Sequence, residues 1–262
     1  MKLFTIIQHS SVALLLGFAT QTDCLAQTEA NKTSDDSTLS FNLGATSDYR
    51  YRGISQSRLE AAVQGGADFN LPATGYYAGT WISTITWIRD TPKAGATPME
   101  WDLYAGRKIS LNDDASLDLG SLAYVYLNNR LDTIGLRNAN TLEIYAQVNY
   151  GSHYFKLSHA VSNLFGIVDS KRSNYLDIGS NLEVAPRWTI NLHAGKQFVN
   201  GVNRQLASYQ DYKIGITKDV GDGLNVSLAV ISTNANPNFY SSPANTKNLG
   251  KRGLVASLVK AF

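Results

Sequence analysis

The stretch Gly253–Phe262, with the sequence GLVASLVKAF, ends the chain and shows a strand-like alternation of side chains. A period of two indicates a β-strand, because successive side chains of a strand point to opposite faces. The same alternation is clear at 141–151, 174–185, 187–199 and 223–233. Turn residues bound these runs, so the sequence predicts an all-β protein.

We expect about twelve strands in one domain over 38–262, with ten or fourteen strands as alternatives. The expected strands are 38–50, 61–71, 75–87, 99–110, 115–127, 141–151, 153–163, 174–185, 187–199, 208–219, 223–233 and 252–262. Short connections alternate with longer ones along this series. That alternation is typical of a single antiparallel transmembrane β-barrel with short periplasmic turns and long outer loops.

Both ends of the chain agree with export to a bacterial outer membrane. Lys2, an apolar run over 12–19 and the small residues around Ala26 indicate a cleaved signal peptide over 1–26. Residues 27–37 are polar and read as a flexible periplasmic lead-in. The terminal Phe262 resembles the signal that outer-membrane barrels present to the barrel-assembly machinery.

Aromatic residues gather near the ends of the expected strands, as in the two girdles of a membrane barrel. We assign these to the periplasmic end: Tyr76, Tyr77, Tyr150, Tyr154, Trp188 and Phe262. We assign these to the outer end: Tyr49, Tyr51, Trp87, Tyr124, Tyr126, Tyr175, Phe198 and Tyr209.

Charged residues interrupt the polar face in mid-strand, and charges that faced lipid would be costly. We therefore expect the apolar face to point outward and the polar face to line a lumen. The expected lining residues are Asp102, Asp118, Glu143, Lys156, Asp177, Glu183, His193, Asp211 and Lys213. A soluble sandwich would place the same carboxylates in water, so this pattern alone does not decide the fold.

A motif at the end of the first strand, Tyr49-Arg50-Tyr51-Arg52-Gly53, continues into Ile54-Ser55-Gln56-Ser57. Together with 62–69 and 75–81 it resembles the TorF-type putative porins, a proteobacterial family first described as a domain of unknown function (Gcw_chp). The resemblance implies an outer-membrane barrel and a possible channel, and it carries no catalytic residues. Interleaved Tyr and Arg side chains could bind an anion or, the reading we favour, fix the loop by cation–π contacts.

The remaining chemistry of the sequence is sparse. The only cysteine is Cys24, inside the expected leader, and the histidines lack metal-ligand spacing, so we expect no cofactor and no metal. His193 is the best candidate for a catalytic base, and a hairpin at Pro186 would place it near Asp177 or Gly179. A lumen hydrogen-bond network is the commoner role for such a histidine.

Basic residues outnumber acidic ones in the expected outer loops, whereas the overall charge is only +2. We therefore expect contacts with outer-membrane lipid and lipopolysaccharide, and no nucleic-acid partner. The function predicted from sequence is passive diffusion of small solutes or ions through a porin-like channel, not enzymatic. The alternatives are a non-conducting barrel whose loops bind a surface ligand or partner, and an outer-membrane lipid-modifying enzyme.

Overall fold

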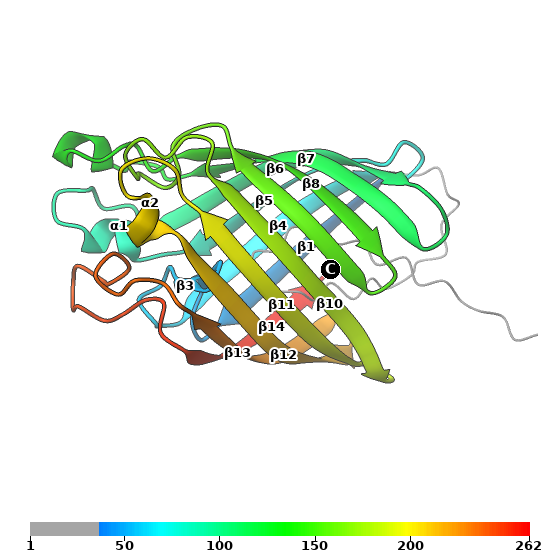
Figure 1. The fold of residues 1–262 in the computed structure, drawn as a ribbon. Helices are drawn as coiled ribbons and strands as arrows, with labels where there is room; N and C mark the ends of the chain where they lie inside the picture. Colours follow the sequence, from blue (N-terminus) through cyan, green and yellow to red (C-terminus); the bar gives the residue numbers. More distant parts are fainter. Residues whose placement is uncertain (1–36) are drawn as a thin grey trace, which may run out of the picture.

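The chain forms one closed barrel of twelve antiparallel strands (Figure 1). The computed structural model describes residues 37–262. The barrel strands are β1 Thr38–Thr46, β4 Ala62–Leu71, β5 Tyr76–Thr84, β6 Met99–Ser110, β7 Ala115–Val125, β8 Thr141–Tyr150, β9 His153–Ala160, β10 Asn174–Ala185, β11 Trp188–Phe198, β12 Tyr209–Gly221, β13 Leu224–Thr233 and β14 Gly253–Ala261. Each strand pairs with its neighbours along the chain, and β1 closes the barrel against β14.

The expected strand number is confirmed, and the differences lie at strand ends. The first strand ends at Thr46 rather than at residue 50, and a separate hairpin of β2 (Arg50–Tyr51) and β3 (Ile54–Ser55) follows it. The third ends at Thr84, before the short helix α1 (Trp87–Asp90). The expected leader over 1–26, and all but the last residue of 27–37, lie outside the described residues.

The connections differ in length at the two ends of the barrel. The long ones, together with α1, the 3₁₀ helix η1 (Leu131–Ile134) and α2 (Arg204–Ala207), gather at one end, on the left in Figure 1. We call this the long-loop end. The other, the short-turn end, has connections such as 151–152 and 186–187, which match the short periplasmic turns of outer-membrane barrels.

The two faces of the barrel wall differ sharply in chemistry. Ile144, Ile178, Leu192 and Leu228 point outward and are 48%, 52%, 38% and 44% exposed. Many other large apolar residues join them on what we call the outward belt. A water-soluble monomer rarely exposes so large an apolar patch, so this belt fits contact with lipid.

The predicted aromatic girdles are only partly correct. Tyr76, Tyr150, Trp188, Phe198 and Phe262 are exposed on the outside as expected. Eight of the tyrosines instead have their side chains inside the barrel: Tyr49, Tyr51, Tyr77, Tyr124, Tyr126, Tyr154, Tyr175 and Tyr209. The prediction used distance from the strand end and ignored parity, which decides the face of every strand residue.

Several of the inward tyrosines cover a glycine on the neighbouring strand. Tyr145 lies opposite Gly120, and Tyr154 lies opposite Gly179. A Cβ atom added to Gly120 would lie 2.2 Å from the Tyr145 hydroxyl oxygen, and one added to Gly179 would lie 2.4 Å from the Tyr154 ring. The glycines therefore let these rings lie close against the wall while their phenols reach the lumen.

The two-faced wall can be tested with one strand. Leu192→Lys should destabilise the barrel by roughly 2–4 kcal/mol, the usual range for a cation near the middle of the lipid-facing surface. Thr189→Lys is the matched control, because Thr189 has inward parity on the same strand and lies opposite Glu183. Urea unfolding in lipid vesicles measures both variants. Equal destabilisation would show that the faces are assigned wrongly.

Candidate functional site in the lumen

The first long loop, residues 47–61, folds into the barrel instead of projecting from it. Its β2–β3 hairpin turns at Arg52 and Gly53, whose φ angles are +47° and +79°. Two positive φ angles are those of a type I′ turn, which favours glycine. A Cβ atom on Gly53 would lie 2.4 Å from Cγ2 of Thr233 and 2.8 Å from Cβ of Asp211. The tip of the hairpin is therefore pressed against β12 and β13.

Asp48 holds the hairpin in shape. Its carboxylate accepts hydrogen bonds from Nε of Arg50 at 2.7 Å and from the Ser55 hydroxyl at 2.5 Å. The Arg50 guanidinium also donates to the carbonyls of Gly53, at 3.1 Å, and Lys251, at 2.7 Å. The first loop is therefore tied both to itself and to the last long loop.

Arg52 fastens the tip of the hairpin to distant walls of the barrel. Its guanidinium makes a two-pronged ion pair with Glu143 on β8, at 3.0 and 2.7 Å, and donates to Gln197 on β11 at 2.7 Å. Its Cζ atom lies 4.2 Å from the ring centroid of Tyr175 and 4.7 Å from that of Tyr51. Because the loop leaves from β1 and β4, these contacts make it cross the lumen.

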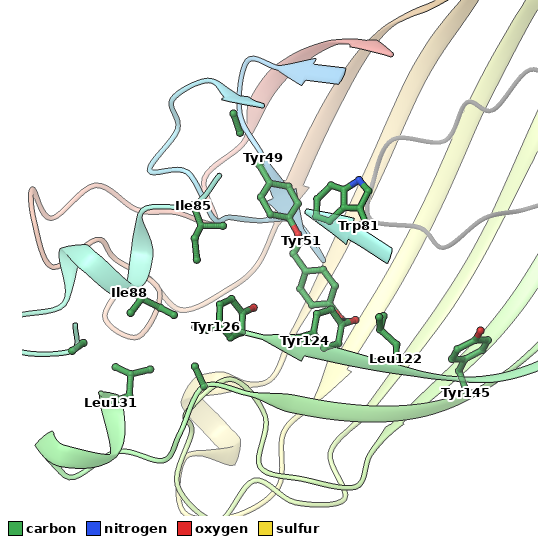
Figure 2. Packing of buried hydrophobic residues seen from close by; sticks show 13 residues of the cluster. Tyr49, Tyr51, Trp81, Ile85, Ile88, Leu122, Tyr124, Tyr126, Leu131 and Tyr145 are labelled. Atoms are coloured by element: carbon green, nitrogen blue, oxygen red, sulfur yellow. Dashed lines mark hydrogen bonds between the residues drawn. The ribbon is translucent and has the colours of Figure 1, made fainter. Parts of the chain in front are cut away.

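Two tyrosine contacts secure the rest of the hairpin (Figure 2). Tyr49 and Tyr126 both donate to the buried carboxylate of Glu100 on β6. The hydroxyls of Tyr51 and Tyr124 lie 2.5 Å apart. Burial, with the nearby Glu100 charge, raises the pKa of the Tyr49 phenol well above its ordinary value, so this phenol stays a donor at physiological pH.

Apolar packing closes the long-loop end above these polar contacts. The ring of Phe165, in the loop after β9, makes edge-to-face contacts with Tyr51 and Tyr124, with centroids 5.4 and 5.0 Å away. Ile85, Ile88 and Leu131 extend the same cluster toward the ends of the loops (Figure 2). The first loop therefore contributes to a continuous cap as well as to a hydrogen-bond network.

His193 lies deeper in the lumen, between two carboxylates. Its Nδ1 is 2.8 Å from Asp177 and its Nε2 is 2.7 Å from Asp211. Because carboxylates accept hydrogen bonds, one on each ring nitrogen favours the doubly protonated, cationic imidazole. Tyr154 and Tyr175 donate to the same two carboxylates, at 3.1 and 2.8 Å.

The two carboxylate contacts of His193 argue against a role as a catalytic base. The histidine was expected near Asp177 or Gly179, and it bonds to Asp177 and lies opposite Gly179 in the sheet. With both nitrogens held by carboxylates, the ring has no lone pair available to accept a proton from a nucleophile. The arrangement is that of a lumen network.

The other lining residues expected from the sequence divide into two groups. The inward and buried group comprises Asp102, Asp118, Glu143, Lys156, Asp211 and Lys213. Glu183 shares the inward parity of Asp177 but is exposed near the short-turn end of β10. Within the described residues, Oδ1 of Asp102 is buried without a hydrogen-bond partner.

Sequence reasoning missed residues that complete the lumen network. Tyr77 donates to Asp118 at 2.6 Å, and Nζ of Lys156 lies 4.3 Å from the ring centroid of Tyr145. Glu100 was also missed. Tyr145 shares its parity with Glu143 and Glu100 with Asp102, so strict parity could have found both. The position of Arg52 had no local signal, because its partners are far away in the sequence.

One small cavity lies under the first loop. A cavity of about 20 Å³, room for about one water molecule, lies against β12, β13 and β14. Lys213, Ser227 and Ser257 supply polar groups to the cavity. Gly215 and Ala229 leave room for it, because their side chains are small or absent.

The sequence matches one family model over residues 29–262, described as a bacterial protein of unknown function (Gcw_chp). The chain belongs to this family. A search of curated proteins finds no match. Among solved structures, the KdgM porin is similar with a TM-score of 0.50 and 6% identity, covering 87% of this chain and 98% of that one. The NanC porin gives 0.51 and 8%, covering 86% and 98%.

These likenesses show a porin-type barrel fold and nothing finer. In residues 37–262, no helix has both the length and the apolar character needed to cross a membrane. Across the same residues, His, Cys, Asp and Glu side chains form no group suited to a metal ion.

Removing Arg52 tests whether it holds the hairpin in the lumen. Arg52→Ala leaves Glu143 buried without its counter-charge, which typically costs about 3–5 kcal/mol. We expect that loss in urea unfolding, with faster hydrogen exchange over 48–57. Arg52→Gln combined with Glu143→Gln removes both charges and should recover most of the stability. A single Arg52→Ala variant with normal exchange and stability would contradict the role given to this ion pair.

Proposed function

We propose that this protein is a porin-like outer-membrane channel for passive diffusion of small solutes or ions, with the first loop as its constriction. The observation that carries the proposal is a hairpin that crosses the lumen of a closed barrel and is fastened to the far walls through Arg52. The outward belt, the unequal ends and the porin-like fold support it. The resemblance of 47–81 to TorF-type putative porins agrees with the same reading.

The placement in the outer membrane is part of this proposal. A leader over 1–26 would export the chain, and Phe262, exposed at the end of the barrel, would present the assembly signal. The short-turn end would face the periplasm. The basic loops at the long-loop end would then meet lipopolysaccharide phosphates, while outer-membrane lipid covers the outward belt.

Passage needs only a local change in such a lumen. The inward face of β12 and β13 carries small residues at Gly215 and Ala229, where the cavity lies. The hairpin tip contacts the same two strands nearer to the long-loop end, at Asp211 and Thr233. A small shift of the tip away from that wall would join the cavity to the outside. Ions and small polar solutes fit this path, whereas large solutes do not.

The charge of the lining favours cations. The inward-facing acids of the strands are Asp68, Glu100, Asp102, Asp118, Glu143, Asp177, Glu183, Asp211 and Asp219. The facing cations are Arg52, Lys108, Lys156, His193 and Lys213. The acids outnumber the cations even when His193 is charged, and a confined negative wall attracts cations.

Conductance in a planar bilayer tests the channel directly. The wild-type barrel should give small single-channel currents, because the hairpin crosses the lumen. Replacing 48–60 with a short Gly/Ser turn should raise the conductance severalfold. Should neither protein carry current after verified insertion, the channel proposal fails and a non-conducting barrel with ligand-binding loops takes its place.

Selectivity is a separate expectation. Reversal potentials in a salt gradient should show weak preference for cations, and Asp177→Asn should reduce it, because Asp177 is a lumen carboxylate. Asp169→Asn is the control, since Asp169 is an exposed residue of the loop after β9. Anion selectivity in the wild type would mean that the basic loops dominate permeation.

The side-chain network across the lumen supports the non-conducting alternative. A barrel filled by side chains needs no passage to hold its loops at the cell surface. The conductance measurement separates the two functions. The lipid-modifying enzyme is disfavoured by the double carboxylate contact of His193.

A further inference from the structure

Four cationic side chains share the outward face of the barrel, although that face is mostly apolar. Each lies over an aromatic ring: Arg107 over Tyr76 at 5.1 Å, Lys196 over Phe198 at 4.8 Å, Lys218 over Trp188 at 4.5 Å and Lys260 over Phe262 at 5.6 Å, measured to the ring centroid. By parity, the carboxylates of the described barrel strands all point inward. The charged side chains of these strands on the outward face are therefore all cationic.

Two of these cations lie close together at the short-turn end, on either side of β13. Lys218 on β12 is opposite Val226 on β13, and Val226 is opposite Leu258 on β14. Lys260 lies two residues beyond Leu258, opposite Leu224. From the usual strand spacing and rise, the two lysine Cα atoms are roughly 12 Å apart.

The aromatic contacts hold both ammonium groups near the rim. Lys218 leans over Trp188, the first residue of β11. Lys260 leans over the terminal Phe262 and donates to the carbonyl of Asp222 in the β12–β13 turn. Long basic side chains place their charge at headgroup depth in this way, while their stems stay on apolar surface.

An apolar row runs up β13 from this basic pair. Val226, Leu228 and Val230 point outward and are 43%, 44% and 46% exposed. The small residue Ala256 lies opposite Leu228 on β14, so the row is flanked there by a shallow strip. The surface thus combines phosphate-binding charges at the rim with an apolar path toward the middle of the barrel.

We propose that this surface, formed by Trp188, Lys218, Lys260, Phe262 and the outward row of β13, is a binding site for an anionic phospholipid. The headgroup phosphate contacts the two ammonium groups, and an acyl chain lies along Val226, Leu228 and Val230. The site rests on the membrane placement proposed above, since it assigns the short-turn end to the phospholipid leaflet.

The proposal also accounts for an irregularity of the last strand. Lys260 occupies an outward position in a segment where an apolar residue would suit a membrane-facing strand better. At the rim, a lysine stacked on the terminal aromatic ring avoids the cost of the bilayer centre and gains the attraction of phosphate.

Lipid titration of the folded barrel tests the site. Native mass spectrometry in neutral detergent would compare dioleoyl phosphatidylglycerol with dioleoyl phosphatidylcholine. Lys218→Gln combined with Lys260→Gln should weaken phosphatidylglycerol binding at least tenfold and leave phosphatidylcholine binding unchanged. Lys218→Arg combined with Lys260→Arg should retain the wild-type affinity, because arginine keeps the charge and the ring contact.

The matched control is Lys171→Gln combined with Lys247→Gln, which removes the same charge from exposed loops at the other end. The site is overturned if the Lys218/Lys260 glutamine variant binds phosphatidylglycerol within twofold of the wild-type affinity. It is also overturned if the loop control loses as much affinity as that variant. A third contrary result is that glycerol phosphate binds as tightly as phosphatidylglycerol. Heat-modifiable gel migration verifies folding, and the two single glutamine variants carry the test if the double variant does not fold.

Conductance separates this inference from the proposed function. The glutamine variant should conduct like the wild type, because both lysines lie outside the barrel. A conducting barrel with unchanged lipid binding overturns only the lipid site. A silent barrel that shows the expected lipid selectivity overturns only the channel.

Discussion

Closure of the sheet is the constraint on which the rest of this structure depends. Once β1 pairs with β14, the barrel has no free edge, and each strand residue has only two environments, inside or outside. A register shift of one residue would turn Asp177 toward the outside and Ile178 into the lumen. The alternation along β10 therefore fixes both the face and the register of its neighbours, and the same holds around the barrel.

Closure leaves a polar interior that the chain must satisfy by itself. A buried carboxylate without a partner is costly, and the phenols of the inward tyrosines meet that need at Glu100, Asp118, Asp177 and Asp211. Such a network adds little to the free energy of unfolding, because the cost of desolvating its charges offsets much of the gain from pairing them. Its main effect is to favour one arrangement of the side chains. The first loop enters this network as a partner, since Arg52 neutralises Glu143 and stacks on Tyr175. In the proposed channel, the loop that narrows the lumen is therefore also the loop that neutralises its buried charge.

Much of the wall could be predicted from the sequence, because its signal is local. The alternation over 174–185 and the turn at Pro186 were enough to bring His193 beside Asp177. The girdles failed where position along the strand was used in place of parity, as at Tyr124 and Tyr175. The inward course of the first loop could not be predicted, because its decisive contact joins Arg52 to Glu143, 91 residues later. Cation–π contact at Arg52 was expected within the loop, and the structure adds a partner on β10.

The distribution of lysines shows how one residue type serves both faces of the same wall. Lys213 and Lys156 point inward, onto the face that carries the carboxylates of the barrel strands. Lys218 and Lys260 point outward, whereas the carboxylates of the described barrel strands point inward. Each of these two ammonium groups contacts an aromatic ring instead of a strand carboxylate. A ring quadrupole compensates only part of the desolvation of an ammonium group, so the outward lysines need a further anion or water. Their position at the rim offers both, which fits outward cations that lie near strand ends, whereas Lys156 and Lys213 of the lumen lie farther from the ends of their strands.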